Sequence, residues 1–484
     1  MPDTAAKTPY DEVAYPSSIF IQTHPALLAA IAGLHGLTAP DVATARVLEI
    51  GGGEGMNLIA FAAAYPKAQC LSFDLSGAAV ARGRLAVARA GLTNIRVEVG
   101  DILDAARDLT QKFDYVICHG VYAWVPDFVR EGIMDLAGKV LADNGVAYIS
   151  YNALPGGRLR LAVRDMLLRE VAGIDDPVAR LETAHAFLDA YIATPEEEDR
   201  PAQAALRSEA RLMRKKPGSV LFHDELGDCF NPQALYDVAV AAERHGLQFL
   251  GDAGEGPLGD GFLPDDVEDV STRAVVRAAQ AQDDRNIRFF RQSLFVRAGQ
   301  LPVRHVDPAL IAPLFVSSSA QRTGQSTFKN KSGEFEMSDT RMVEILGHLT
   351  QIYPERVPIQ ELSDDDAVVR ALHGLFEAGL TELHSVQVPC ATTPPERPTA
   401  SVLSRAQLLD DQIQICTLDH HIVKIAEAAP RAFIAMLDGT RTLAELQEQW
   451  AQTGYAADTS FDAAMKLVIR AAFLERPGDG EDDG

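Results

Sequence analysis

The chain contains 484 residues, of which 47% are hydrophobic, and this length predicts two to four domains rather than one core. Acidic residues outnumber basic ones by 68 to 44, so the formal net charge is −24. This balance argues against a general nucleic-acid binder, because lysine and arginine supply the affinity for phosphates. It fits a cytoplasmic protein that attracts a basic protein or peptide, and plain solubility explains the charge equally well.

The N-terminal residues MPDTAAKTPYDEVAYPSS lack the basic and apolar regions of a signal peptide. We expect no membrane span, because the chain has no run of about 18 apolar residues. The five cysteines lie far apart and form no C-x-x-C pair, which argues against a zinc site and a disulfide framework. We therefore expect a cytoplasmic location and no bound metal.

Strand-like and helix-like segments alternate through residues 46–152. The expected strands are 45–50, 68–76, 94–101, 112–121 and 144–152, and helical spacing fills the intervals between most of them. Such alternation predicts a parallel, Rossmann-like sheet that helices cover on both faces. Ligands of such sheets bind at the carboxyl ends of the strands.

Two later segments, 247–253 and 291–299, also read as strands and can complete a seven-stranded sheet. Residues 158–225 then form a helical insertion. The segment NPQALYDVAVAAERHG, residues 231–246, is expected to be a helix. Its asparagine suits the N-cap, its proline suits the first turn, and its final glycine suits the C-terminal cap.

Residues 301–392 and 400–476 are expected to form two small α+β units, separated by the proline-rich segment TPPERPT. Each unit ends in a helix that runs into a short strand. This common ending suggests duplicated winged-helix-like folds, with coincidence as an equal alternative. The last residues, 477–484, have the composition of a disordered tail.

The segment EIGGGEG, residues 49–55, joins the first strand to the first helix. It misses the G-x-G-x-x-G spacing of dinucleotide-binding proteins, because its third glycine comes one position early. A pyrophosphate favours a helix N-terminus free of acids, whereas Glu49 and Glu54 flank this turn. Two carboxylates favour a cation, so we prefer the methyl donor S-adenosylmethionine to NAD. The glycines expected at the cofactor are Gly51, Gly53 and Gly55.

Acidic residues also end the next two strands. Asp74 is placed to accept hydrogen bonds from both ribose hydroxyls of an adenosine. Asp101 is placed to accept from the adenine amino group while Ile102 packs on the ring. A single strand-end aspartate is often a helix cap, but acids at three successive strand ends favour one shared site. The adjoining Asn57 and Leu75 are included among the expected cofactor contacts.

The methyl acceptor is expected over the ends of the fourth and fifth strands. His119 is a candidate base or a partner of the cofactor's carboxylate, and a buried structural histidine is the alternative. Tyr122 and Trp124 are candidates for an aromatic wall that contacts an amine, or for packing under the next helix. Tyr151 and Asn152 end the fifth strand, where side chains face the pocket.

An N-terminal segment and a later loop complete the candidate site. Residues 1–40 carry Tyr15 ahead of the first strand and are expected to cover the cofactor as a lid. His223 and Glu225 are candidates for binding a substrate ammonium group, and a loop of solvated charges is the alternative. The acids and histidines show no spacing that suits a metal.

The acid–glycine run at 49–55, with Asp74 and Asp101, resembles the class I S-adenosylmethionine-dependent methyltransferases. Four phrases resemble, more narrowly, bacterial proteins that carry a methyltransferase regulatory domain, a group that includes the rickettsial protein-lysine methyltransferases. These phrases are YDEVAYPSSIFIQTHP (10–25), CHGVYAWVP (118–126), YISYNALPGG (148–157) and LFHDEL (221–226). One departure is that Leu154-Pro155-Gly156-Gly157 replaces a phrase that contains an aromatic residue, which favours a different substrate if this segment touches it.

The resemblance implies a methyltransferase domain within residues 41–300, of which 215–300 is similar to the regulatory domain. It also implies methylation of protein lysine side chains by a homodimer. A methyltransferase for a small molecule, acting on nitrogen or oxygen, is the first alternative. A cofactor-binding regulator without turnover is less favoured, because the acids and glycines are all present. The C-terminal units lack a basic stripe, which disfavours DNA recognition.

Overall fold

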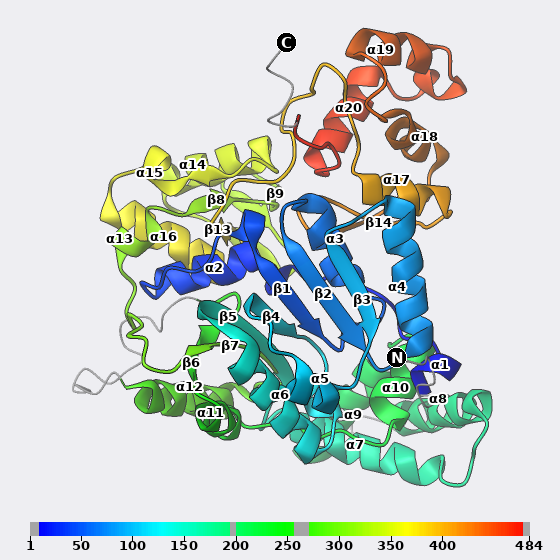
Figure 1. Cartoon of the computed structure of the whole chain (residues 1–484), viewed down its shortest axis with the longest axis vertical. Coiled ribbons are helices and arrows are strands. Elements are labelled where there is room, and N and C mark those ends of the chain that lie inside the picture. Colours follow the sequence, from blue (N-terminus) through cyan, green and yellow to red (C-terminus); the bar gives the residue numbers. More distant parts are fainter. Residues whose placement is uncertain (1–8, 194–199, 256–270, 478–484) are drawn as a thin grey trace.

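The computed structural model describes residues 9–193, 200–255 and 271–477 (Figure 1). Its centre is a seven-stranded sheet with the order β3-β2-β1-β4-β5-β7-β6, in which β7 alone runs antiparallel to its neighbours. This sheet confirms the expected Rossmann-like fold. The strands are β1 (Arg46–Ile50), β2 (Gln69–Asp74), β3 (Ile95–Val99), β4 (Phe113–Cys118), β5 (Leu141–Asn152), β6 (Leu247–Asp252) and β7 (Phe290–Arg297).

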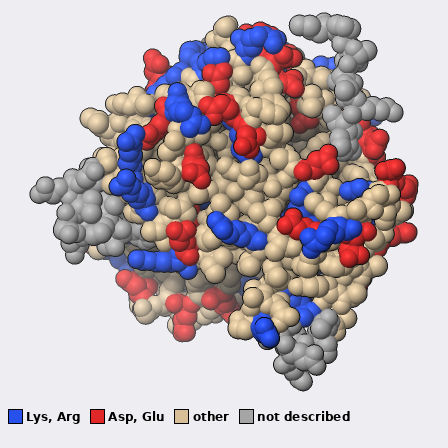
Figure 2. All heavy atoms as spheres, turned by 90° about the horizontal axis from the view of Figure 1, so that it is seen from below, with Lys and Arg blue, Asp and Glu red and all other residues tan. Residues whose placement is uncertain are grey.

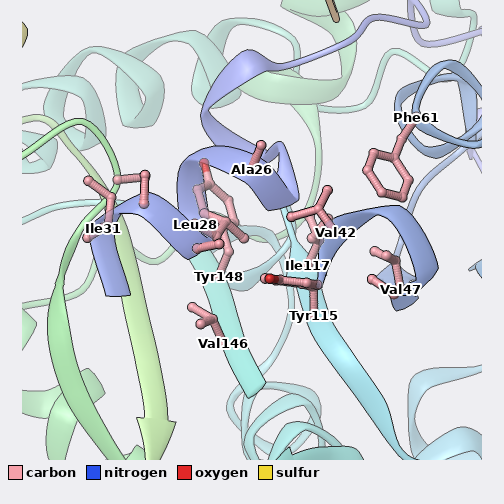
Figure 3. Packing of buried hydrophobic residues seen from close by; sticks show 14 of the residues in the cluster. Ala26, Leu28, Ile31, Val42, Val47, Phe61, Tyr115, Ile117, Val146 and Tyr148 are labelled. Carbon is pink, nitrogen blue, oxygen red and sulfur yellow. The ribbon is translucent and has the colours of Figure 1, made fainter. Parts of the chain in front are cut away.

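Helices cover both faces of the sheet because successive side chains of each strand point to opposite faces. On one face α2 (Pro25–Leu34), α3 (Met56–Ala64) and α4 (Gly77–Ala90) share a core with Val47, Tyr115 and Tyr148 (Figure 3). On the other face a second core contains Leu48 and Val116. Its helices are α5 (Ile102–Asp108), α6 (Asp127–Val140), α11 (Leu235–Arg244) and α12 (Thr272–Asn286).

Helix α2 corrects the expected extent of the N-terminal lid. Its residues Ala26, Leu28 and Ile31 are fully buried against the sheet, as Figure 3 shows. Of the expected 1–40 segment, only the part before α2 is therefore free to lie over a site. Residues 1–8 lie outside the described structure.

The helical insertion follows β5 and has its own apolar core. It lies at the lower edge of the molecule in Figure 1. Helix α7 also contacts α9 and α10, so the insertion forms one packed body. The described helices are α7 (Gly157–Glu170), α8 (Pro177–Ala193), α9 (Pro201–Arg214) and α10 (Gly218–Leu226).

The middle unit shares its core with the sheet domain. It contains two small sheets, with strand orders β12-β8-β13 and β11-β10-β9. These strands are β8 (Phe315–Ser317), β9 (Gln321–Arg322), β10 (Thr327–Lys329), β11 (Glu334–Glu336), β12 (Val357–Pro358) and β13. Helices α14 (Thr340–Ile352) and α16 (Asp366–Glu377) flank them, and β13 (Glu382–His384) packs against α2. Buried residues of this unit belong to the same cluster as those of α2.

The C-terminal unit has a separate core, built mainly from α18 (Ala428–Met436), α19 (Leu443–Ala451) and α20 (Phe461–Arg470). Its first helix, α17 (Val402–Leu409), lies beside α3 and α4 in Figure 1 and contacts both. The unit also carries the two-stranded sheet of β14 (Gln414–Cys416) and β15 (Ile422–Lys424). Both C-terminal units are thus α+β, as expected. The expected tail lies outside the described residues apart from its first position.

The helix predicted at 231–246 is shorter than expected. It begins at Leu235 because the residues before it bond to neighbouring segments instead of turning into a helix. Asn231 donates its backbone N–H to the carbonyl of Ala123 in the turn after β4, and Gln233 donates to Asn152. Gln233 also forms an isolated parallel bridge with Ala153, just beyond the carboxyl end of β5.

Charged side chains are mixed on the face shown in Figure 2, where basic and acidic groups alternate without a continuous basic surface. Within the described residues, no helix combines the length and apolar character needed to cross a membrane. The same residues contain no cluster of three or more histidines, cysteines and acids arranged around a metal.

Candidate functional site

The glycine turn after β1 is held against β2 and is open on one side. Gly51 donates its N–H to the carbonyl of Phe73 at 2.9 Å. Gly51, Gly53 and Gly55 have φ of 67°, 60° and 72°, a conformation that favours glycine. A Cβ on Gly51 would lie 2.6 Å from Val121, whereas a Cβ on Gly53 would meet nothing within 4 Å. A ligand can therefore approach the backbone of Gly53.

Asp74, at the end of β2, lies beside this opening. Its Oδ2 accepts a 2.9 Å hydrogen bond from the N–H of Gly53, and its Oδ1 accepts a 2.8 Å bond from the N–H of Ser76. Burial raises the pKa of this carboxyl, and the two backbone donors oppose the shift. Two carboxylate oxygens offer about four acceptor positions, so Asp74 can also accept from a vicinal diol.

Asp101 follows the neighbouring strand β3. Asp74 pairs with Val99 in the sheet, so Asp101 lies at the same carboxyl edge. Its Oδ1 caps α5 by accepting from the N–H of Leu103 at 2.6 Å. Asp101 is thus a helix cap at the position expected for an adenine contact. Asp101 and the half-buried Ile102, with the exposed Leu75, stay predicted cofactor contacts.

Glu49 and Asn57 lie beneath the turn, which corrects their expected direct contact with the cofactor. Glu49 is 4% exposed, and its Oε1 and Oε2 accept from Asn57 Nδ2 at 2.8 Å and Ser72 Oγ at 2.9 Å. A Cβ on Gly52 would lie 2.5 Å from Glu49 Oε2. The side chain therefore supports the backbone from the inner side.

The two acids of the turn present less negative charge to a ligand than the sequence suggests. Burial raises the pKa of Glu49 to about 7, so the carboxyl is partly protonated at neutral pH. Glu54, the other acid of the turn, forms an ion pair with Arg82. The preference for a methyl donor must therefore rest on Asp74 and on the fold.

His119 lies at the carboxyl end of β4, in a pocket of hydroxyl and aromatic groups. Its Nδ1 is 2.9 Å from the hydroxyl of Tyr148 and 3.1 Å from Ser150 Oγ. The ring of Phe20 lies over it, with 4.0 Å between the ring centroids. Burial lowers the pKa of His119 to about 4, so the imidazole is neutral at physiological pH. None of these three neighbours is predicted by local sequence patterns around His119.

Tyr122 and Tyr151 do not face this pocket, which corrects their expected catalytic role. They are 3% and 1% exposed and belong to the core on the α6 and α11 side. The hydroxyl of Tyr151 lies 3.1 Å from Ser293 Oγ. Alternation along β5 explains the difference, since Tyr148 and Ser150 point to one face and Tyr151 to the other. Asn152 is half-buried and points to the same face of β5 as Ser150, so it stays a candidate for the acceptor side of the site.

Trp124 already contacts a cation from within the chain. The guanidinium carbon of Arg160 lies 4.9 Å from the Trp124 ring centroid and 4.8 Å from that of Phe230. The two rings themselves are 4.6 Å apart. Arg160, from α7 of the insertion, therefore occupies this side of the expected aromatic wall, and Trp124 itself packs against the second core of the sheet domain.

Glu225 is likewise neutralised by its own chain. It is fully buried and contacts Arg160 at 2.7 Å and Lys216 at 2.6 Å. Asp224 contacts the same two cations, at 3.1 and 2.9 Å. This network corrects the expectation that Glu225 binds a substrate ammonium group, because its oxygens already have cationic partners.

The segment before α2 is anchored on this charged network. His223 Nε2 lies 2.6 Å from the carbonyl oxygen of Val13, and its ring stacks on Tyr10 at 4.2 Å. Tyr15 donates its hydroxyl to Asp224 at 3.3 Å. His223 therefore binds the N-terminal segment, which corrects its predicted role as a substrate ligand. Tyr15 stays a predicted contact of the cofactor.

The same segment reaches the opposite side of the site through α1 (Pro9–Glu12). Asp11 Oδ1 accepts from Ser76 Oγ at 2.7 Å and from the N–H of Ala78 at 3.2 Å. Ser76 also donates its backbone N–H to Asp74. The N-terminal segment thus runs from the insertion to the loop that holds Asp74.

Comparisons with known proteins assign two parts of the chain to described domains. A family model described as a methyltransferase domain matches residues 41–174, and one described as a predicted methyltransferase regulatory domain matches residues 217–297. The chain is 37% identical over 244 residues to the uncharacterized protein RP028 of Rickettsia prowazekii (strain Madrid E), covering 50% of this chain and 97% of RP028. It is 34% identical over 292 residues to RP789 of the same organism, covering 60% of this chain and 53% of RP789.

Among solved structures, PKMT2 from Rickettsia typhi shares the fold. The TM-score is 0.77 at 21% sequence identity, over 95% of this chain and 100% of PKMT2. The sheet, its glycine turn and the matching domain define a methyltransferase, as the sequence predicts. Within that class, the chain belongs to the same family as RP028, and residues 217–297 carry the match to the regulatory domain.

Proposed function

We propose that the chain transfers a methyl group from S-adenosylmethionine to lysine side chains of proteins. The observation that carries the choice of donor is Asp74, which lies beside the open backbone of Gly53. Support also comes from PKMT2, whose structure was solved in complex with AdoHcy, the demethylated form of this donor. The fold of the present chain matches that complex at a TM-score of 0.77.

The residues present fit this donor. The open space beside Gly53 suits the methionine part of the donor, and Asp74 suits its ribose hydroxyls. Asp101 and Ile102 suit the adenine, since they follow the carboxyl end of the next strand. When bound, the donor supplies a methyl group activated on a positively charged sulfur. The chain's own task is then to position the acceptor in line and to exclude water.

His119 suits an amine acceptor better than an anionic one. Its neutral imidazole does not repel a lysine ammonium group or a sulfonium, and it can exchange hydrogen bonds with an amine. The hydroxyls of Tyr148 and Ser150 fix the orientation of the ring through Nδ1. Phe20 covers one face of the ring. We assign His119 the role of accepting a hydrogen bond from the N–H of the neutral amine, which leaves the amine lone pair free to attack the methyl group. The ammonium proton is lost to water before the transfer.

Protein lysine is the acceptor supported by the group that the sequence resembles, to which PKMT2 belongs. The net charge of −24 adds support, because an acidic protein attracts basic segments of a partner. A homodimer in the cytoplasm is the assembly and location that the same resemblance and composition favour. Sedimentation of the purified chain would test the dimer.

The acceptor class can be tested with methyl-labelled S-adenosylmethionine and a cell lysate. We expect the full chain to transfer label to protein bands, and an Asp74→Ala variant to transfer little. Label that stays in the small-molecule fraction would instead identify a metabolite methyltransferase. Donor binding without any transfer of label would identify a regulator without turnover.

A further inference from the structure

We propose that His420, from the C-terminal unit, is a positioning residue for the cofactor-binding glycine turn and acts through Asn57. The inference rests on the proposed function, because it requires the donor to bind at this turn. It assigns the C-terminal unit a direct part in cofactor affinity. The two residues are 363 positions apart in the sequence.

His420 lies in the tight turn between β14 and β15 and is 3% exposed. Its Nε2 is 3.0 Å from Asn57 Oδ1. The backbone N–H of Phe20 donates to the same oxygen at 2.9 Å, which fixes the orientation of the Asn57 amide. Because that oxygen only accepts, His420 must donate from Nε2.

Asn57 passes this restraint to the glycine turn. Its Nδ2 donates to Glu49 Oε1 at 2.8 Å and to Thr23 Oγ1 at 3.0 Å. Glu49 and Ser72 together fill the space beneath Gly52 and leave no room there for a Cβ. A continuous series of buried hydrogen bonds therefore connects His420 to the inner side of the turn.

The same amide also controls the ring that covers His119. Phe20 is held by its backbone N–H to Asn57, and its ring lies 4.0 Å from the imidazole of His119. Asn57 thus joins the C-terminal unit, the glycine turn and the segment over the acceptor side. Removal of the His420 donor would leave a buried acceptor with one partner fewer and allow the amide to move.

A purely structural role for His420 makes a different prediction. In that case any weakening of the contact between the C-terminal unit and the sheet domain would have the same effect. Arg89 of α4 and Asp410, just after α17, form such a contact as a partly exposed ion pair. This pair lies outside the series of hydrogen bonds that reaches Glu49, so Arg89→Ala is a matched control.

The test compares the full chain with His420→Ala, His420→Gln and Arg89→Ala, by calorimetry with S-adenosylmethionine and by steady-state kinetics. The φ of His420 is 65°, so alanine and glutamine bear a similar backbone cost and differ in the side-chain donor. We expect His420→Ala to raise the Kd and KM for the donor by about 5-fold or more, the effect of one unmade buried hydrogen bond. His420→Gln should restore most of the affinity, and Arg89→Ala should leave it unchanged.

The proposal is overturned if folded His420→Ala binds the donor as tightly as the original chain does. It is also overturned if Arg89→Ala weakens binding equally, or if His420→Gln gives no rescue. Should His420→Ala fail to fold, His420→Leu keeps the side-chain volume without the donor and gives the same comparison. Failure of the original chain to bind S-adenosylmethionine would contradict the proposed function itself.

Discussion

Asp74 Oδ2 accepts a 2.9 Å hydrogen bond from the backbone N–H of Gly53. This bond ties the end of β2 to the open point of the glycine turn, so the two parts of the proposed donor site are held together. The carboxyl also accepts from Ser76, which contacts Asp11 of the N-terminal segment. Asp74 is therefore the residue through which turn, strand and lid segment meet.

Substitution of Asp74 should weaken donor binding. We expect Asp74→Ala to raise the Kd for S-adenosylmethionine by about 10- to 100-fold, the loss of two hydrogen bonds to a charged acceptor. Isothermal titration calorimetry measures this change. Unchanged affinity in a folded variant would remove Asp74 from the site.

Gly53 and Gly51 should respond differently to alanine, although both have positive φ. A Cβ on Gly53 points into open space, so Gly53→Ala should reduce donor affinity with a cost to stability of only about 1 kcal/mol from the backbone. A Cβ on Gly51 would meet Val121 at 2.6 Å, so Gly51→Ala should lower the melting temperature further. Equal donor affinity in Gly53→Ala and the original chain would show that no ligand occupies this opening.

Glu49 should make stability depend on pH in the neutral range. Burial raises its pKa from 4.5 to about 7, so the folded chain holds a proton that the unfolded chain releases. The resulting stability is fully present below about pH 4.5 and is lost as the pH rises through 7. Glu49→Gln removes this titration, so the original chain should lose stability relative to Glu49→Gln between pH 5 and 8, by about 2 to 3 kcal/mol or less.

Denaturant unfolding at several pH values measures that difference. The pKa of Asp74 is also raised by burial, but Asp74 titrates in both proteins. The difference between the original chain and Glu49→Gln therefore reports on Glu49 alone. A constant difference between the two proteins across this range would show that Glu49 stays charged in the folded chain.

Glu225 should matter for stability rather than for acceptor binding. It is fully buried between Arg160 and Lys216, and both cations keep Asp224 as a partner when Glu225 is neutralised. The loss is therefore that of hydrogen bonds between charged groups, roughly 1.5–3 kcal/mol. We expect Glu225→Gln to lower the unfolding free energy by a similar amount and to leave the KM for the acceptor nearly unchanged while folded. A normal melting temperature with a raised acceptor KM would restore Glu225 as a substrate ligand.

Local signals in the sequence predict the framework of this site. The glycine turn and the acids at Asp74 and Asp101 lie at strand ends that hydrophobic patterning locates without tertiary information. The placement of the seventh strand follows from the same patterning. These features require only the order of elements along the chain and the rule that parallel strands end at one edge.

The errors concern side chains whose partners are distant in the sequence. Tyr148 and Tyr151 lie on opposite faces of β5, and only the face of Tyr148 meets His119. Helices bury both faces of such a sheet, so apolar patterning does not distinguish one face from the other. The cation on Trp124 comes from Arg160, and the donor to Asn57 comes from His420. Neither pairing has a spacing that a single sequence reveals.

The most direct test of the account is amino-acid analysis of a protein acceptor after reaction with methyl-labelled S-adenosylmethionine. The account predicts that the label appears as methylated lysine with the original chain, and that Asp74→Ala reduces it strongly. Label on any other amino acid, or label that does not depend on Asp74, would contradict it.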